Sequence, residues 1–394
     1  MTFDRRRARI AAAGALAAAA AVAVVVLAVT APSPRHAPPP PSPSPSPRPG
    51  LPPPSGQSFG VNVNLLFNDF SYPAAQINAQ LAAVRSTGAT VARSDALWEA
   101  AEPQAPAAGH HRYDWRFDDE IAGSLAANGL TWLPILDYSA PWAQSIPGVD
   151  HSPPSSDVDY AAYAGAFASR YGPGGSFWRA HPQITPQPVT TIEIWNEPDQ
   201  PEFWKPAPNP GAYAALYLAA RAAIDAADPG IRVIVGGLTD PRAFLPELLQ
   251  AAPRLRARID GVAIHPYGRP ATVLSKVVAA RATLDSLGLD RVPLYVTEFG
   301  WTTSPPGASD YVPAARRPAD IESTLTALGR AGCGLAMVVL YTWVTPGGDP
   351  GDSQNWYGIA NPTQPADGTA GTAALTAGVR AASRTPGAAS TACR

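Results

Sequence analysis

Residues 191–198 read Thr-Ile-Glu-Ile-Trp-Asn-Glu-Pro, a short β-rich run that ends in polar residues before a proline. A second run of the same kind, residues 294–301, reads Leu-Tyr-Val-Thr-Glu-Phe-Gly-Trp. Branched and aromatic residues fit strands, and each run has a glutamate near its carboxyl end, Glu197 and Glu298. The two runs therefore predict two strands that each present a carboxyl group where the strand ends.

Outward from these two runs, β-rich segments alternate with alanine-rich segments of helical periodicity. In residues 74–87, for example, Ile77, Leu81 and Val84 share one face and Gly88 follows as a stop signal. Alternating strands and helices indicate right-handed crossovers and a parallel sheet, and eight such units fit a (β/α)8 TIM barrel. The expected strands are Phe59–Val63, Thr90–Arg93, Thr131–Leu136, Thr191–Asn196, Arg232–Gly236, Gly261–His265, Leu294–Glu298 and Leu335–Tyr341.

A doubly wound open sheet is the alternative fold. It would need a glycine-rich phosphate turn after the first strand. Residues 62–65 read Asn-Val-Asn-Leu, which is no such turn. The barrel is therefore the favoured fold.

The N-terminal residues have the composition of an export signal. Four arginines within residues 5–9 precede residues 10–29, which carry no charged side chain and are long enough to span a bilayer. Small residues at 29–31 form an acceptable cleavage site, but Pro32 follows directly, so we favour an uncleaved anchor over a cleaved signal peptide. The positive-inside rule then places the rest of the chain outside the cytoplasm, anchored at the cell surface or secreted.

Composition divides the chain into four parts. Residues 1–31 are expected to be the signal peptide or anchor. Residues 32–56 are rich in proline and serine, a composition that samples polyproline II and serves as a spacer. Residues 57–384 hold the barrel, and residues 385–394 form a C-terminal tail.

Charge and motif content exclude several classes of protein. The 394 residues carry a net charge of -2, which argues against a nucleic-acid binder. Two cysteines and six histidines, without a His-Glu-x-x-His motif, provide no zinc ligand set. There is neither a P-loop nor a Gly-x-Ser-x-Gly elbow, and Asp349 and Asp352 are too few carboxylates for a calcium site. We therefore expect no metal and no cofactor.

Polar and aromatic residues gather where the strands end, which is where barrels of this kind place their sites. Strands four and seven lie across the barrel, so Glu197 and Glu298 would face one another over its mouth. Two facing carboxyls, one protonated and one ionised, are the equipment for hydrolysing a glycosidic bond. Seven tryptophans also fall at or after strand ends, where flat rings suit sugars: Trp98, Trp142, Trp195, Trp204, Trp301, Trp343 and Trp356.

Side-chain alternation along the strands gives a further expectation. Glu298 shares the register of Val296, and Glu197 shares that of Trp195 and Glu193. We expect each glutamate to keep the register of its own strand. Glu193 should then point into the barrel, where a buried carboxylate needs a partner.

These motifs carry a resemblance to a known group of enzymes. Residues 195–198, Trp-Asn-Glu-Pro, with residues 297–300, Thr-Glu-Phe-Gly, resemble the clan A glycoside hydrolases, which are (β/α)8 retaining enzymes. Residues 196–206 and the His-Pro-Tyr-Gly at 265–268 look most like glycoside hydrolase family 39, with family 5 as the near rival. The resemblance covers roughly residues 59–382.

The resemblance implies roles for individual residues. Glu197 matches the acid/base, Glu298 the nucleophile, and Asn196 the residue that holds the sugar 2-hydroxyl. Arg93 would fix the charge of the nucleophile, and Tyr267 would hydrogen-bond to it. The remaining substrate contacts are expected at His265, Trp343, Trp204, Trp142 and Tyr138.

The expected function is an extracytoplasmic retaining glycoside hydrolase acting on O-glycosidic bonds, β bonds foremost, of an oligo- or polysaccharide. Its partners are that carbohydrate and, through an uncleaved anchor, a membrane. Two alternatives stay open: a carbohydrate-binding barrel without turnover, and a transglycosidase that uses the same residues.

The two cysteines are expected to pair. Cys333 lies before the eighth strand, in a helix-to-strand turn at the bottom of the barrel, and the last helix runs back toward that face. The tail should therefore bring Cys393 close to Cys333, outside the membrane, where disulfides persist. The alternative is two free thiols.

Overall fold

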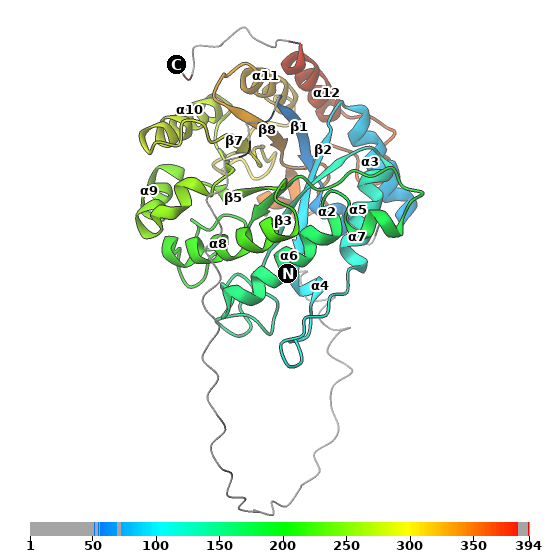
Figure 1. Cartoon of the computed structure of the whole chain (residues 1–394). Helices are drawn as coiled ribbons and strands as arrows, with labels where there is room; N and C mark the ends of the chain where they lie inside the picture. Colours follow the sequence, from blue (N-terminus) through cyan, green and yellow to red (C-terminus); the bar gives the residue numbers. More distant parts are fainter. Residues whose placement is uncertain (1–50, 52–53, 55, 69–71, 385–392, 394) are drawn as a thin grey trace, which may run out of the picture. The chain divides into compact units, whose positions relative to one another are not determined.

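The protein is described from a computed structural model that covers residues 51, 54, 56–68, 72–384 and 393 (Figure 1). The expected anchor, nearly all of the linker, and the tail apart from Cys393 lie outside the described residues. In the described part of the chain, no helix has the length and apolar character needed to cross a membrane.

Eight parallel strands close into a barrel in chain order, with β1 pairing to both β2 and β8. Helices pack around the barrel (Figure 1), so the expected (β/α)8 barrel is confirmed. The strands are β1 Ser58–Asn62, β2 Val91–Leu97, β3 Thr131–Asp137, β4 Thr191–Ile194, β5 Arg232–Leu238, β6 Gly261–Ile264, β7 Leu294–Val296 and β8 Leu335–Leu340.

Four of the described α-helices, α6, α8, α9 and α12, begin at capping side chains that the sequence supplies. Ser156, Asn209 and Asp240 each accept a hydrogen bond from a backbone N–H in the first turn, and Thr369 forms a capping box. The helices are α2 Asn64–Phe67, α3 Ala74–Ser86, α4 Trp98–Ala101, α5 Arg116–Ala127, α6 Asp157–Tyr171, α7 Ser176–Ala180, α8 Pro210–Ala227, α9 Pro241–Ala251, α10 Pro270–Ser286, α11 Arg317–Gly329 and α12 Ala370–Ser383, with 3-10 turns η1 Pro253–Ala257 and η2 Ser353–Trp356.

Two apolar clusters form the core. A large cluster fills the layer between the strands and the helices. A small one lies inside the barrel and draws on six strands: Val91, Leu133, Ile234, Ala263, Tyr295, Ala336 and Val339. Burying a large aliphatic or aromatic side chain stabilises the fold by about 1.5–3 kcal/mol, so both clusters hold the strand ends in place.

Strands four and seven end earlier than expected. β4 stops at Ile194 and β7 at Val296 rather than at Asn196 and Glu298. Trp195 and Glu197 have φ angles of 65° and 45°, in the left-handed region, so the chain leaves the strand conformation directly after Ile194. The backbone turn, and not the strand, therefore aims Glu197.

The alternation expected for Glu298 is wrong for a related reason. Tyr295 belongs to the cluster inside the barrel, whereas Leu294 and Val296 belong to the outer cluster. Strict alternation would direct Glu298 outward with Val296. Because β7 ends at Val296, the next residues turn, and Glu298 reaches the mouth of the barrel.

The structure pairs Cys333 with Cys393 in a disulfide, with 5.1 Å between the Cα atoms and a sequence separation of 60. Cys333 is buried in the turn before β8, next to the outer core. The bond ties Cys393 to this end of the barrel, away from the strand ends that carry the glutamates.

Removing this disulfide should lower stability and leave the chemistry of the mouth unchanged. Closing a loop of this length contributes roughly 4 kcal/mol through the unfolded chain's lost entropy. We expect the Cys333→Ser/Cys393→Ser variant to melt at a lower temperature, as should the reduced wild-type chain. Thiol titration of the denatured, non-reduced chain is the control, and two reactive thiols per chain would contradict the pairing.

Candidate active site

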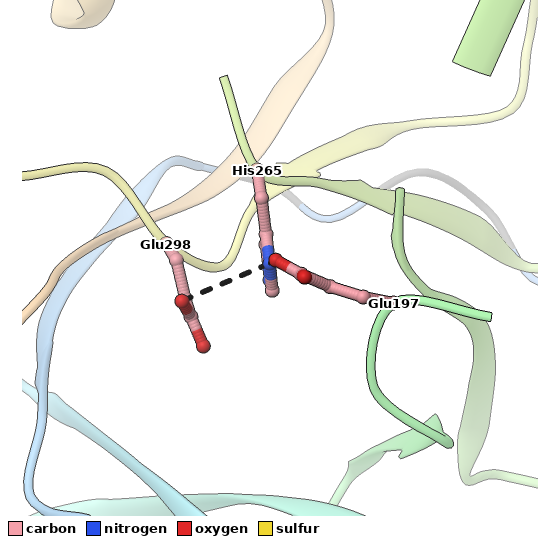
Figure 2. A group of neighbouring side chains, drawn as sticks. All are labelled: Glu197, His265 and Glu298. Carbon is pink, nitrogen blue, oxygen red and sulfur yellow. Dashed lines mark hydrogen bonds and ion pairs between the residues drawn. The ribbon is translucent and has the colours of Figure 1, made fainter. Parts of the chain in front are cut away.

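The mouth of the barrel brings together Glu197, His265 and Glu298, which follow β4, β6 and β7 (Figure 2). The Nδ1 atom of His265 lies 2.6 Å from Oε1 of Glu197 and 3.7 Å from Oε2 of Glu298. An oxygen of each glutamate and a ring nitrogen of His265 all lie within 4.8 Å of one another. The two carboxyl groups therefore face each other with one imidazole between them.

The turn after β4 sends neighbouring side chains in opposite directions. The indole of Trp195 lies in the outer core, where its N–H donates to the carbonyl of Phe203 at 2.7 Å and its ring meets that of Trp204. Asn196 and Glu197 instead point to the mouth, where they contact Arg93 and His265. Anchoring Trp195 on the outside is what leaves Glu197 free to enter the site.

Glu298 lies among groups that favour its ionised form. It accepts hydrogen bonds from Nη1 of Arg93 at 2.5 Å and from the Tyr267 hydroxyl at 2.7 Å. Burial alone would raise the pKa of this carboxyl. The positive charges of His265 and Arg93, with the hydrogen bonds from Tyr267 and Arg93, outweigh burial and hold the pKa of Glu298 below its usual value.

Glu197 has the opposite environment. Burial is the main reason that its pKa is raised, and the negative charges of Glu298 and Asp199 add to the effect. The hydrogen bond from His265 and the charge of that ring oppose the shift without reversing it. At a pH between the two values, Glu298 is ionised while Glu197 still holds a proton.

A buried ion pair lies below the two glutamates. Arg93 on β2 and Glu193 on β4 are both fully buried, with Nε of Arg93 donating to Oε2 of Glu193 at 2.8 Å. Nη2 of Arg93 also donates to Oδ1 of Asn196 at 3.1 Å. Glu193 points into the barrel, as expected, and its partner is the arginine that holds Glu298.

Two members of the site were not expected from the sequence. The hydroxyl of Thr297 donates to Oε1 of Glu193 at 3.2 Å and lies 3.1 Å from Nε2 of His265. Gly237 donates its N–H to Glu193 at 2.8 Å, and a Cβ at this position would lie 2.0 Å from Nε2 of His265. The glycine at the end of β5 was the available signal, since close backbone approach is a common reason for glycine in a strand.

A second acidic pair lies on the side of β2 and β3. Asp95 accepts hydrogen bonds from Asn64 at 2.8 Å and Asn68 at 2.7 Å, and burial raises its pKa to about 6. Asp137 is buried, and one of its oxygens has no hydrogen-bond partner among the described residues. Burial, followed by the charge of Asp95, raises the pKa of Asp137 well above its usual value.

The aromatic residues expected to contact substrate differ in their exposure: two are partly exposed and two are buried. Tyr138 is partly buried at the mouth, 4.2 Å from the ring of His151. Trp142 is partly exposed, and its indole N–H donates to the carbonyl of Glu102. Trp204 and Trp343 are each 1% exposed and packed into the outer core. The structure does not bring these two rings to an open wall.

The clustering of Glu197, His265 and Glu298 is accounted for by their hydrogen bonds, without a bound metal ion. Histidine and carboxylate oxygens are ligand types for zinc, but each oxygen of Glu298 accepts a hydrogen bond from Arg93 or Tyr267. The guanidinium of Arg93 would also repel a cation. The arrangement is suited to acid–base and nucleophilic chemistry at the two carboxyls.

The fold has well-defined relatives among solved structures. A family 39 glycoside hydrolase from Xanthomonas axonopodis pv. citri superposes with a TM-score of 0.62 and 19% identity, over 83% of this chain and 67% of that one. A family 39 β-xylosidase from Caulobacter crescentus gives a TM-score of 0.61 and 21% identity, over 84% and 72% of the two chains. The expected likeness to family 39 is confirmed at the level of the fold.

Similarity in sequence covers a smaller part of the chain than similarity in fold. A β-xylosidase from Geobacillus stearothermophilus is 26% identical over 137 residues, which is 29% of this chain. The match spans about a quarter of that protein's length, 26%. No family model matches the chain.

Proposed function

We propose that the protein is a retaining glycoside hydrolase that cleaves O-glycosidic bonds, β bonds foremost, of an oligo- or polysaccharide. The observation that carries the proposal is the pair of Glu197 and Glu298, whose oxygens approach within 4.8 Å and whose pKa values are displaced in opposite directions. Retaining enzymes place their carboxyls about 5–5.5 Å apart, and inverting enzymes about 6.5–9.5 Å. The likeness in fold to family 39 enzymes supports the same conclusion.

The first half of the reaction uses both side chains at once. The ionised carboxylate of Glu298 attacks the anomeric carbon, and the bond from that carbon to the leaving oxygen breaks. Glu197 gives its proton to the leaving oxygen, so the aglycone departs as an alcohol. A glycosyl ester on Glu298 and an ionised Glu197 remain.

The second half reverses the roles. Glu197, now a carboxylate, takes a proton from a water molecule as the water oxygen attacks the anomeric carbon. The ester bond to Glu298 breaks, the sugar leaves with its original anomeric configuration, and both glutamates return to their starting states. Arg93 and Tyr267 receive the returning negative charge on Glu298.

The proposal extends to the location of the enzyme. The basic residues 5–9 and the apolar residues 10–29 support an extracytoplasmic catalytic domain held by an uncleaved anchor, with residues 32–56 as a spacer. The carbohydrate would then be a polymer or oligomer met outside the cytoplasm. Aryl β-xylosides are the first substrates to test, because two of the similar proteins are named β-xylosidases.

The roles of the two glutamates can be separated by leaving group. Glu298→Ala should lose at least about 10³-fold in turnover on every substrate, because it removes covalent catalysis. Glu197→Ala should still form the glycosyl ester from a dinitrophenyl glycoside, whose leaving group needs no proton, and azide should restore its turnover. Glu247→Ala, an exposed carboxyl on α9, is the matched control. Equal losses on the dinitrophenyl substrate would overturn the assignment.

The stereochemical outcome is a separate prediction. Two successive displacements at one carbon give net retention. Proton NMR of a fresh digest of an aryl β-glycoside should show the β-anomer of the free sugar first, followed by mutarotation. If the α-anomer appears first, the double-displacement mechanism is wrong, even where the enzyme is active.

The location is tested with the full chain and its own N-terminus. Because Pro32 follows the small residues 29–31, the protein should sediment with membranes and be released by detergent but not by high salt. Surface proteolysis of intact cells should remove the catalytic domain. Mature protein in the medium that begins at Pro32 would show instead that a signal peptidase cleaves there.

A further inference from the structure

A chain of hydrogen bonds joins the two glutamates through the barrel interior. Glu298 contacts Arg93, Arg93 contacts Glu193, and Glu193 contacts Thr297. Thr297 in turn contacts Nε2 of His265, whose Nδ1 contacts Glu197. Glu193, Thr297 and His265 are at most 1% exposed, so water does not replace any of these bonds.

The donors in this chain can be assigned by following the protons. Glu193 accepts hydrogen bonds from Arg93, from the N–H of Gly237 and from Thr297, so all of its contacts are acceptor contacts. A threonine hydroxyl carries one proton, and Thr297 gives it to Glu193. The oxygen of Thr297 can then only accept from His265, which places a proton on Nε2.

With Nε2 protonated, the state of His265 is decided at Nδ1. That atom lies 2.6 Å from Glu197 and 3.7 Å from Glu298. When Nδ1 also carries a proton, the ring is a cation that donates to Oε1 of Glu197. The acid proton of Glu197 is then excluded from Oε1 and must lie on Oε2, the oxygen of this carboxyl that His265 does not contact.

The same cation serves both halves of the reaction. Before the attack the negative charge of the pair lies on Glu298, and in the glycosyl ester it lies on Glu197. His265 is within reach of both positions, whereas Arg93 is hydrogen-bonded to Glu298 and not to Glu197. The charge thus moves from one side of a fixed imidazolium to the other.

We propose that Thr297 and Glu193 are positioning residues that hold a proton on Nε2 of His265. Nδ1 then faces both glutamates and directs the acid proton of Glu197 to Oε2. This assignment of roles rests on the proposed glycosidase function. The proton placement itself does not, because it follows from the hydrogen bonds alone.

The charged groups around His265 agree with a cationic ring. Glu197 and Glu298 face it directly, Glu193 acts through Thr297, and the positive charge of Arg93 opposes it. Burial lowers the pKa of His265, but the charges of the two glutamates and the hydrogen bond to Glu197 raise it to above the usual value. The Tyr267 ring stands edge-on, 6.3 Å from the imidazole.

Nitrogen NMR of the full chain tests the placement without any substrate. The protein has six histidines, so the resonances of His265 can be assigned in uniformly ¹⁵N-labelled protein by comparison with His265→Asn. We expect Nε2 to stay protonated across the pH range in which Nδ1 titrates. A neutral ring with its proton on Nδ1 alone would overturn the proposal.

Substitution of Thr297 then tests the positioning role. Thr297→Val keeps the shape and removes the acceptor, which leaves the Nε2 proton without a partner and destabilises the cation. In the pH profile of kcat/KM for Thr297→Val, the basic limb should move to lower pH by about one unit. The value of kcat/KM should fall about 10-fold for substrates with poor leaving groups and change little for dinitrophenyl glycosides. Thr297→Ser should keep the wild-type profile.

The outcomes of these experiments distinguish a failure of the positioning role from a failure of the proposed function. Matching profiles for Thr297→Val and wild type, at equal melting temperature, would remove the positioning role. A Thr297→Val variant that melts lower and loses activity equally on all leaving groups would mark Thr297 as structural only. If no glycoside is hydrolysed but the spectra show a fixed Nε2 proton, the proposed function fails and the proton placement stands.

Discussion

The site depends on one buried guanidinium. Arg93 is fully buried on β2, and its three nitrogens contact Glu193, Glu298 and Asn196. An unpaired charge in this place would destabilise the barrel by several kcal/mol, so the arginine and the two carboxylates must be assembled together. Arg93 on β2, Glu193 on β4 and Glu298 just after β7 are thereby tied together across the barrel interior, and Glu298 is placed as part of what keeps the fold stable.

The placement of Glu197 and Glu298 shows which features of the site can be predicted from the sequence and which cannot. The barrel and the pairing of Glu197 with Glu298 follow from strand–helix alternation and from two short motifs. Alternation along the strands fails at Trp195 and at Glu298, because β4 and β7 end before these residues. The positive φ angles of Trp195 and Glu197 are a property of the folded turn. They cannot be predicted from the residue types, because tryptophan and glutamate rarely adopt a positive φ.

The same reasoning explains why some residues were missed or misplaced. Thr297 precedes Glu298 in the sequence, but its contacts with His265 and Glu193 exist only because these two residues meet it from other strands. Gly237 matters because the imidazole occupies the space of its missing Cβ. Trp204 and Trp343 were expected to contact the substrate because they follow strand ends in the sequence, but both are packed in the outer core. Position along the chain fixes the height of a side chain in the barrel, and the turn that follows the strand fixes its direction.

Contact with Arg93 separates the carboxyls of the mouth into two groups. Asp95, Asp137, Glu193, Glu197 and Glu298 crowd around Arg93 and His265, so there are too few positive charges for all five to be ionised. Arg93 gives hydrogen bonds to Glu193 and Glu298 and to none of the other three.

Those other three, Asp95, Asp137 and Glu197, all have raised pKa values, with burial as the first cause. Glu298, in contact with the guanidinium, has a lowered one. Burial favours the neutral form of every carboxyl here. At Glu298 it is outweighed by the charges of His265 and Arg93 and by the hydrogen bonds from Tyr267 and Arg93, so Glu298 is the glutamate that suits the proposed role of nucleophile.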